Sequence, residues 1–140
     1  MTATVLDNFT FPECARLLGL EILDADAARG WVRIRFEGKR EFCNASGRHI
    51  QGGILAAMLD DTMGPAVLIM TNAELSPTTI DMNVSYFAPA FPGPIYGEAL
   101  VLQLGKTIGF VEAWLTDGAG RRLARATASV RLTPMAKVIA

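Results

Sequence analysis

Two glycines stand directly before the longest apolar segment of the chain, and an aspartate interrupts that segment eight residues after the first glycine. The glycines are Gly52 and Gly53, and the acid is Asp60. A helix that begins at the glycines has free backbone N–H groups and roughly half a positive charge at its N-terminus. These groups could polarise a carbonyl oxygen and hold an oxyanion. A glycine pair alone can equally well serve only to make a tight turn.

The carboxylate of Asp60 lies two helical turns beyond Gly52, or roughly 12 Å along a helix axis. No Lys or Arg occurs between Gly53 and Met70, so the helix itself cannot neutralise this charge, and an acid in such a segment is either paired or functional. Burial makes a carboxylate a stronger base, as general-base chemistry requires. Asp61 lies about 100° further round the helix. We expect Asp60 to face the reacting group and Asp61 to bond locally or at an interface, although spacing alone does not decide between the two acids.

The elements that must position these groups follow from the apolar pattern. The segment from Gly53 to Met70 is rich in helix formers and apolar nearly all round, which predicts a helix buried on most sides. The two acids in its middle and the interruption at Gly64 and Pro65 argue against a membrane span. A short helix is predicted over 12–18. Alternating or apolar runs predict strands over 20–25, 31–36, 79–86, 95–104, 108–116 and 122–132, the last three as an antiparallel meander.

This order predicts an α+β fold in which a curved antiparallel sheet wraps round the long helix in one domain, residues 1–140. The uncovered side of the helix and the sheet edges would then need a second subunit. Composition supports a homo-oligomer, because 51% of the residues are hydrophobic and only 19% are charged.

Composition also limits the partners. The 13 Lys and Arg against 14 Asp and Glu give a net charge of -1 and no basic stripe, so we expect no nucleic acid partner. Cys14 and Cys43 lie far apart, which indicates neither a disulfide framework nor a cysteine zinc site, and no metal or cofactor is expected. The first residues lack the basic and apolar regions of a secretory signal, so a cytoplasmic protein without membrane contact is expected.

The motifs together resemble the signature of hot-dog-fold acyl-CoA thioesterases of the phenylacetate-degradation (PaaI-like) type, within the thioesterase superfamily. That signature has Asn and Gly, then His-Gly-Gly, six mostly small or apolar residues, and Asp. The corresponding residues here are Asn44, Gly47, Gln51-Gly52-Gly53 and Asp60. The likeness continues through Thr79 to Tyr86, Gly105-Lys106-Thr107 and the closing strands, and so covers about residues 12 to 132.

The resemblance implies hydrolysis of an acyl- or aryl-CoA thioester to the free acid and CoA, by a homodimer or homotetramer with its active site at the subunit interface. Asp60 would be the catalytic carboxylate, as base toward water or as nucleophile, and the Gly52 N–H would bind the thioester carbonyl. Asn44 would orient water or substrate from a loop that faces the Asp of the partner subunit. Thr79 would line the acyl end, and the pantetheine and CoA channel would be flanked by Lys106, Thr107 and Ile108.

The chain departs from the signature at two points. Gln51 replaces the usual His before the glycines, and one extra residue separates Gly47 from that position. A Gln side chain can still donate to a carbonyl. His49 is the only histidine and could take over the missing role, or could be a surface residue of the loop. Three alternatives to a thioesterase remain. One is a non-catalytic acyl-CoA or lipid-binding module of the same fold, and another is a hydratase, which the absence of a His after either Asp disfavours. The third is a structural protein without a ligand, in which the Asn, Gly-Gly and Asp pattern would be accidental.

Overall fold

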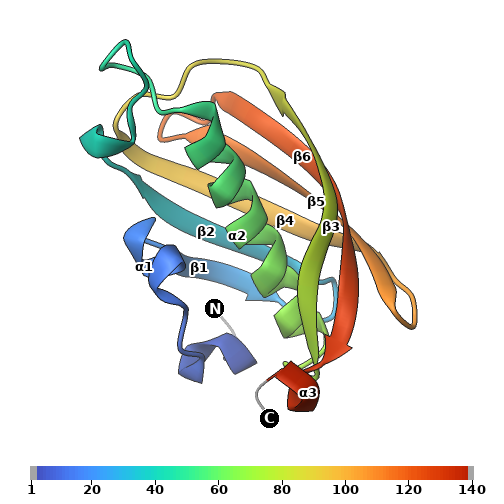
Figure 1. Ribbon diagram of the computed structural model, residues 1–140. Coiled ribbons are helices and arrows are strands. Elements are labelled where there is room, and N and C mark those ends of the chain that lie inside the picture. The colour runs from blue at the N-terminus through green and yellow to red at the C-terminus, as the bar shows by residue number, and fades with distance from the viewer. Residues whose placement is uncertain (1–2, 139–140) are drawn as a thin grey trace.

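A six-stranded antiparallel sheet curves around one long helix in the computed structural model, which describes residues 3–138 (Figure 1). The long helix is α2, Gly52–Met70. The strands are β1 (Glu21–Asp26), β2 (Trp31–Gly38), β3 (Leu75–Tyr86), β4 (Gly93–Leu104), β5 (Ile108–Asp117) and β6 (Arg122–Pro134). Short helical turns complete the fold: η1 (Val5–Asn8), α1 (Glu13–Leu17), η2 (Arg40–Phe42) and α3 (Met135–Val138). The predicted α+β architecture is confirmed.

The strand order β1-β2-β4-β5-β6-β3 places the first strand after α2 at the far edge of the sheet. The predicted meander of β4, β5 and β6 is confirmed, and every neighbouring pair is antiparallel. Because the chain passes from β2 through α2 to β3, the helix crosses the concave face of the sheet diagonally (Figure 1). The edges of the sheet are β1 and β3.

Small residues on the concave face let α2 lie close to the central strands. Ala99, Ala113 and Ala126 are register partners across β4, β5 and β6, and all three are buried. Gly97 precedes this row on the same face of β4. A Cβ atom built on Gly97 would lie 2.5 Å from Oγ1 of Thr62, a buried residue of α2. The helix and sheet are therefore packed without room for an added methyl group.

The helix differs from its prediction at two points. It begins at Gly52 rather than Gly53, and it continues through Pro65 instead of being interrupted there. The Pro65 ring removes the helical donor to the Asp61 carbonyl, but Gly64 has no Cβ to clash with that ring. Burial of Pro65 in the core stabilises this turn of the helix.

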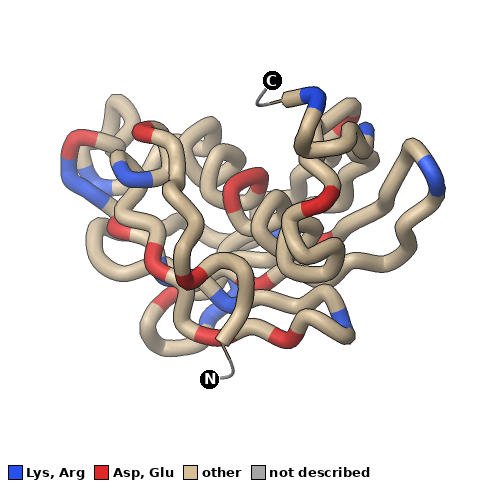
Figure 2. Tube along the Cα trace, turned by 90° about the horizontal axis from the view of Figure 1, so that it is seen from below, with Lys and Arg blue, Asp and Glu red and all other residues tan. Residues whose placement is uncertain are grey.

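One side of α2 remains uncovered in the single chain, as predicted. This side is a stripe of small and acidic residues, Gly53, Ala56, Ala57, Asp60, Asp61 and Gly64, all half-buried or exposed. The helix has the length and apolar character of a membrane span, but ten of its residues are buried in the core. Lys and Arg residues are scattered over many segments of residues 3–138 rather than gathered in one stripe (Figure 2).

The contact between Gly97 and Thr62 predicts the effect of Gly97→Ala. The new methyl group overlaps Thr62 Oγ1 and should lower the free energy of unfolding by about 1 to 3 kcal/mol, the usual cost of overpacking. Urea unfolding would measure this loss. Thr62→Ala removes the overlapping oxygen, so the double variant should lose less than the sum of the two single variants. Gly118→Ala is the control, because a Cβ there meets nothing within 4 Å. Additive losses in the double variant would contradict this packing.

Candidate active site

The N-terminus of α2 presents unpaired backbone donors. Gln51 caps the helix in an extended conformation, with φ -61° and ψ 139°, and makes no capping hydrogen bond with its side chain. The N–H groups of Ile54 and Leu55 both donate to the Gln51 carbonyl, over 3.0 and 3.2 Å. The N–H groups of Gly52 and Gly53 come before these and have no acceptor within the helix. They are available to an oxygen atom of a ligand.

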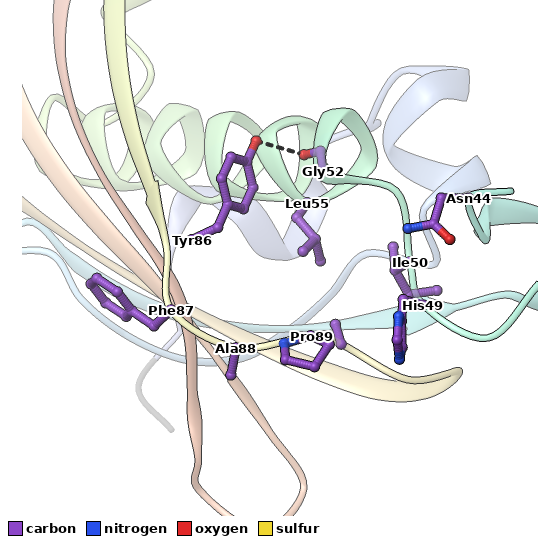
Figure 3. A pocket seen from close by; sticks show the side chains of 10 residues that line it. Asn44, His49, Ile50, Gly52, Leu55, Tyr86, Phe87, Ala88 and Pro89 are labelled. Atoms are coloured by element: carbon purple, nitrogen blue, oxygen red, sulfur yellow. Dashed lines mark hydrogen bonds between the residues drawn. The ribbon is translucent and has the colours of Figure 1, made fainter. Parts of the chain in front are cut away.

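Tyr86, at the end of β3, closes over the first residue of α2. Its hydroxyl donates to the Gly52 carbonyl over 2.8 Å (Figure 3). A Cβ atom on Gly52 would lie 3.3 Å from the tyrosine ring, so the absence of a side chain allows this close approach. The contact ties the end of β3 to the start of the helix. The sequence analysis placed Tyr86 in a strand but missed this role, because nothing in the local sequence indicates which residue a strand end will meet.

A cavity of about 370 Å³ lies beside this helix N-terminus. Asn44 borders it, and the Asn44 Oδ1 atom accepts the Ser46 N–H over 3.0 Å and the Ser46 hydroxyl over 2.6 Å. These bonds hold the loop and leave the side-chain NH₂ group of Asn44 as the available donor. The cavity is lined by Asn44, His49, Ile50, Gly52, Leu55, Tyr86, Phe87, Ala88, Pro89 and Ala90 (Figure 3).

His49 lines this cavity, whereas Gln51 is not among its lining residues. The His49 ring is half-buried and packs edge to face on Phe91, with 5.0 Å between ring centroids. The Gln51 side chain is exposed, and its Oε1 atom lies 3.1 Å from the position of a Cβ on Gly53. In the single chain, the histidine that lines this cavity therefore stands two residues before the position of the signature His.

Asp60 lies in a different cavity, of about 430 Å³, where the middle of α2 faces β3. Its Oδ1 atom accepts a hydrogen bond from the Thr79 hydroxyl over 2.6 Å. Thr79, expected at the acyl end, thus orients the candidate catalytic carboxylate and leaves the second carboxylate oxygen free. The cavity is lined by Asp60, Asp61, Met63, Gly64, Pro77, Thr78, Thr79 and Val130.

A β-bulge in β3 aims Thr79 at the helix. Thr79 pairs with Val130 and Asp81 with Ser129, so Ile80 is an extra residue in β3. Residues two apart in a regular strand share a face, but the bulge turns Asp81 away from Thr79. Asp81 lines a hollow on the outer face of the sheet with Leu102 and Phe110. The sequence pattern alone did not reveal this bulge.

Asp61 lies in the same cavity as Asp60, although the sequence analysis expected the helical offset to separate the two acids. Burial and, second, the neighbouring charge of Asp60 raise the pKa of Asp61 from 3.8 to about 6. Among residues 3–138, no ion pair is formed by either acid. The cavity therefore holds two carboxylates and no compensating cation from its own walls.

A single chain does not bring the expected oxyanion donor, the Gly52 N–H, and the candidate catalytic carboxylate of Asp60 into one cavity. Gly52 and Asp60 line separate cavities. The turn with Lys106 and Thr107 joins β4 to β5 and is exposed, and neither cavity is lined by Lys106, Thr107 or Ile108. Ile108 pairs with Arg131, which in turn pairs with Thr78, so this turn lies toward the Asp60 cavity.

Comparison with known proteins places this geometry in a family. The sequence model described as the thioesterase superfamily matches residues 47–124, which include Gly52, Asp60 and Thr79. The chain belongs to the thioesterase superfamily. It is 34% identical to human acyl-coenzyme A thioesterase 13 over 109 residues. This match covers 77% of this chain and 76% of the human protein.

Solved structures of this superfamily confirm the hot-dog fold. A phenylacetic acid degradation-related protein from Ralstonia eutropha JMP134 superposes with a TM-score of 0.83 and 29% identity, covering 91% of this chain and 95% of that one. The PaaI protein of E. coli superposes with a TM-score of 0.78 and 19% identity, covering 87% and 85%, and shows the same fold. The resemblance to the PaaI-like type is confirmed.

The raised pKa of Asp61 predicts a pH-dependent stability difference. Below pH 3.8 this acid is protonated in the folded and unfolded states, and above pH 6 the folded protein must hold it charged. Raising the pH through this window therefore destabilises the wild type relative to Asp61→Asn. Because the side chain is only half-buried, we expect the advantage of the variant to grow by about 1 to 2 kcal/mol between pH 4 and 7. Urea unfolding of both proteins across that range measures it, and a difference independent of pH would contradict it.

Proposed function

We propose that this chain hydrolyses acyl-CoA thioesters to the free acid and CoA, with Asp60 as the catalytic carboxylate and the Gly52 N–H as oxyanion donor. The observation that carries the proposal is the hydrogen bond from Thr79, which holds one oxygen of Asp60 and leaves the other free in the Asp60 cavity. Membership of the thioesterase superfamily and 34% identity to a human acyl-coenzyme A thioesterase support it.

The chemistry follows from the two groups. The thioester carbonyl oxygen accepts the Gly52 N–H, and the positive end of the helix stabilises the negative charge that develops on it. A water molecule gives a proton to Asp60 as its oxygen bonds to the carbonyl carbon. The carbon–sulfur bond then breaks, and the CoA sulfur leaves with a proton. Direct attack by Asp60, followed by hydrolysis of the resulting anhydride, gives the same products.

The active site is shared between two subunits in this proposal. Gly52 and Asn44 of one subunit would face Asp60 of the partner subunit, which would join the two half-sites that a single chain keeps apart. The uncovered side of α2 and the unpaired edge of β3 support such an interface. Exposed Ile80 on that edge, 58% accessible in the single chain, would be covered by it. The assembly is a homodimer or a homotetramer of two such pairs.

Asp60→Asn tests the carboxylate. The substitution keeps the side-chain volume but removes the base, so kcat should fall on the order of 10² to 10⁴-fold while the protein still folds. Thiol release from hexanoyl-CoA, followed by absorbance, measures the loss. Asp61→Asn is the matched comparison and should lose much less, because Thr79 orients Asp60 and not its neighbour. Nearly full activity in Asp60→Asn would favour a non-catalytic acyl-CoA-binding module.

Gly52→Pro tests the oxyanion donor. Proline removes the N–H and adds a ring. The ring can be accommodated here because the first position of a helix accepts proline and Gln51 already has the extended conformation that must precede it. We expect kcat to fall about 10² to 10³-fold, as for loss of one oxyanion-hole donor. Gly52→Ala is the control: it places a Cβ equally close to Tyr86 but keeps the N–H. Equal losses in the two variants would mean that the added carbon, and not the missing donor, causes the defect.

Assemblies that contain both variants test the sharing of the site. Asp60→Asn and Gly52→Pro chains with different affinity tags can be expressed together and purified through both tags. If the site is shared, a mixed dimer has one doubly altered site and one intact site, and at least about a quarter of wild-type activity should return. Mixed assemblies as inactive as both parents would mean that Gly52 and Asp60 act within one chain.

A further inference from the structure

The Asp61 carboxylate occupies the wall of the Asp60 cavity without a structural partner. Within residues 3–138 it makes neither a hydrogen bond to a protein group nor an ion pair, whereas Asp60 beside it is held by Thr79. Burying a charge without a partner costs free energy. Asp61 therefore does not stabilise the fold. Its position in the cavity wall allows it to influence which ligands bind there.

The elements that line this cavity within one subunit supply no positive charge to its walls. The charged residues of α2 are Asp60 and Asp61 alone. On β3 the charged residue is Asp81, which the bulge turns to the outer face. On β6 the wall is Val130, and the neighbouring Arg131 is exposed on the opposite face of the strand. The walls that one subunit contributes to this cavity therefore carry negative charge and no positive charge.

We propose that Asp61 is a specificity-determining residue that excludes acyl groups with a terminal carboxylate. This inference depends on the proposed thioesterase function, in which the thioester carbonyl lies beside Asp60. The acyl chain then extends along the wall that Asp61 shares. A second carboxylate on that chain would lie within several ångströms of one or two fixed negative charges, in a site partly shielded from water.

The size of the discrimination follows from Coulomb's law. Two like charges about 5 Å apart, at an effective dielectric constant of about 20, disfavour binding by roughly a hundredfold. A neutral acyl chain meets no such repulsion, and Met63 and Val130 offer it apolar contact in the same cavity. Asp61 would therefore discriminate by charge and not by size.

Matched substrates separate charge from size. Hexanoyl-CoA and adipoyl-CoA have the same six-carbon chain and differ only in a terminal methyl against a terminal carboxylate. The methyl ester of adipoyl-CoA is larger but neutral. At pH 7.5, above the raised pKa of Asp61, we expect the wild-type kcat/KM for adipoyl-CoA to be at least about 30-fold below that for hexanoyl-CoA. The ester should be cleaved within a fewfold of hexanoyl-CoA.

Dividing kcat/KM for hexanoyl-CoA by kcat/KM for adipoyl-CoA gives the selectivity ratio. Asp61→Asn should lower this ratio by about tenfold or more, since it removes one charge without changing the shape of the cavity wall. Asp61→Ser is a second neutral variant in case the first folds poorly. Asp81→Asn is the matched control, because it removes a carboxylate from the outer face of β3, and it should leave the ratio unchanged.

Three results would overturn the assignment of Asp61: equal cleavage of the acid and hexanoyl-CoA by the wild type, an unchanged ratio in both Asp61 variants, or rejection of the ester as strong as that of the acid. These results differ from a failure of the proposed function itself. In that case the wild type would cleave none of the three substrates, hexanoyl-CoA included, and both proposals would be rejected together.

Discussion

The fit of α2 into the concave face of the sheet is the constraint on which the other features depend. The alanine row across β4, β5 and β6 and the absence of a side chain at Gly97 set how near the helix axis can come. Close packing at this contact also holds α2 in place against β3, where Thr79 and Tyr86 bond to it. The candidate donors at the N-terminus of α2 and the Asp60 carboxylate are therefore held on a tightly packed helix, and rigid placement of this kind is what a preorganised site requires.

Much of the fold could be predicted from the sequence because the determining patterns are local. The alternation in β2 and in the second part of β3, the turn residues between β4, β5 and β6, and the apolar run of α2 can each be recognised in a short window of sequence. The features that could not be predicted are those that depend on contacts between segments far apart in the sequence. Continuation of the helix through Pro65 depends on burial and on Gly64, and the pairing of β3 with β6, far along the chain, could not be seen in β3 itself.

The candidate site was predicted in part, and for similar reasons. Gly52 and Asp60 stand in a fixed spacing on one helix, so a motif can identify them. The contact from Tyr86 to Gly52 and the bond from Thr79 to Asp60 join β3 to α2 over 34 and 19 residues. Such contacts depend on strand register, which a bulge changes by one residue. The position of His49 in the cavity likewise depends on how the loop before α2 folds, and not on its distance from the glycines along the chain.

The bulge at Ile80 also divides β3 into two segments that can evolve separately. In an unbroken strand, any insertion that re-aims Thr79 would invert every side chain beyond it and expose Met82 and Val84, which pack against the core. The extra residue, Ile80, confines this change of side-chain direction to the bulge. Pro77 and Thr78 can thereby vary with the ligand, whereas Thr79 is constrained by its hydrogen bond to Asp60. Met82 and Val84 are constrained by packing against the core. Substitutions before the bulge can therefore change the contacts with a ligand without disturbing the packing of the strand beyond it.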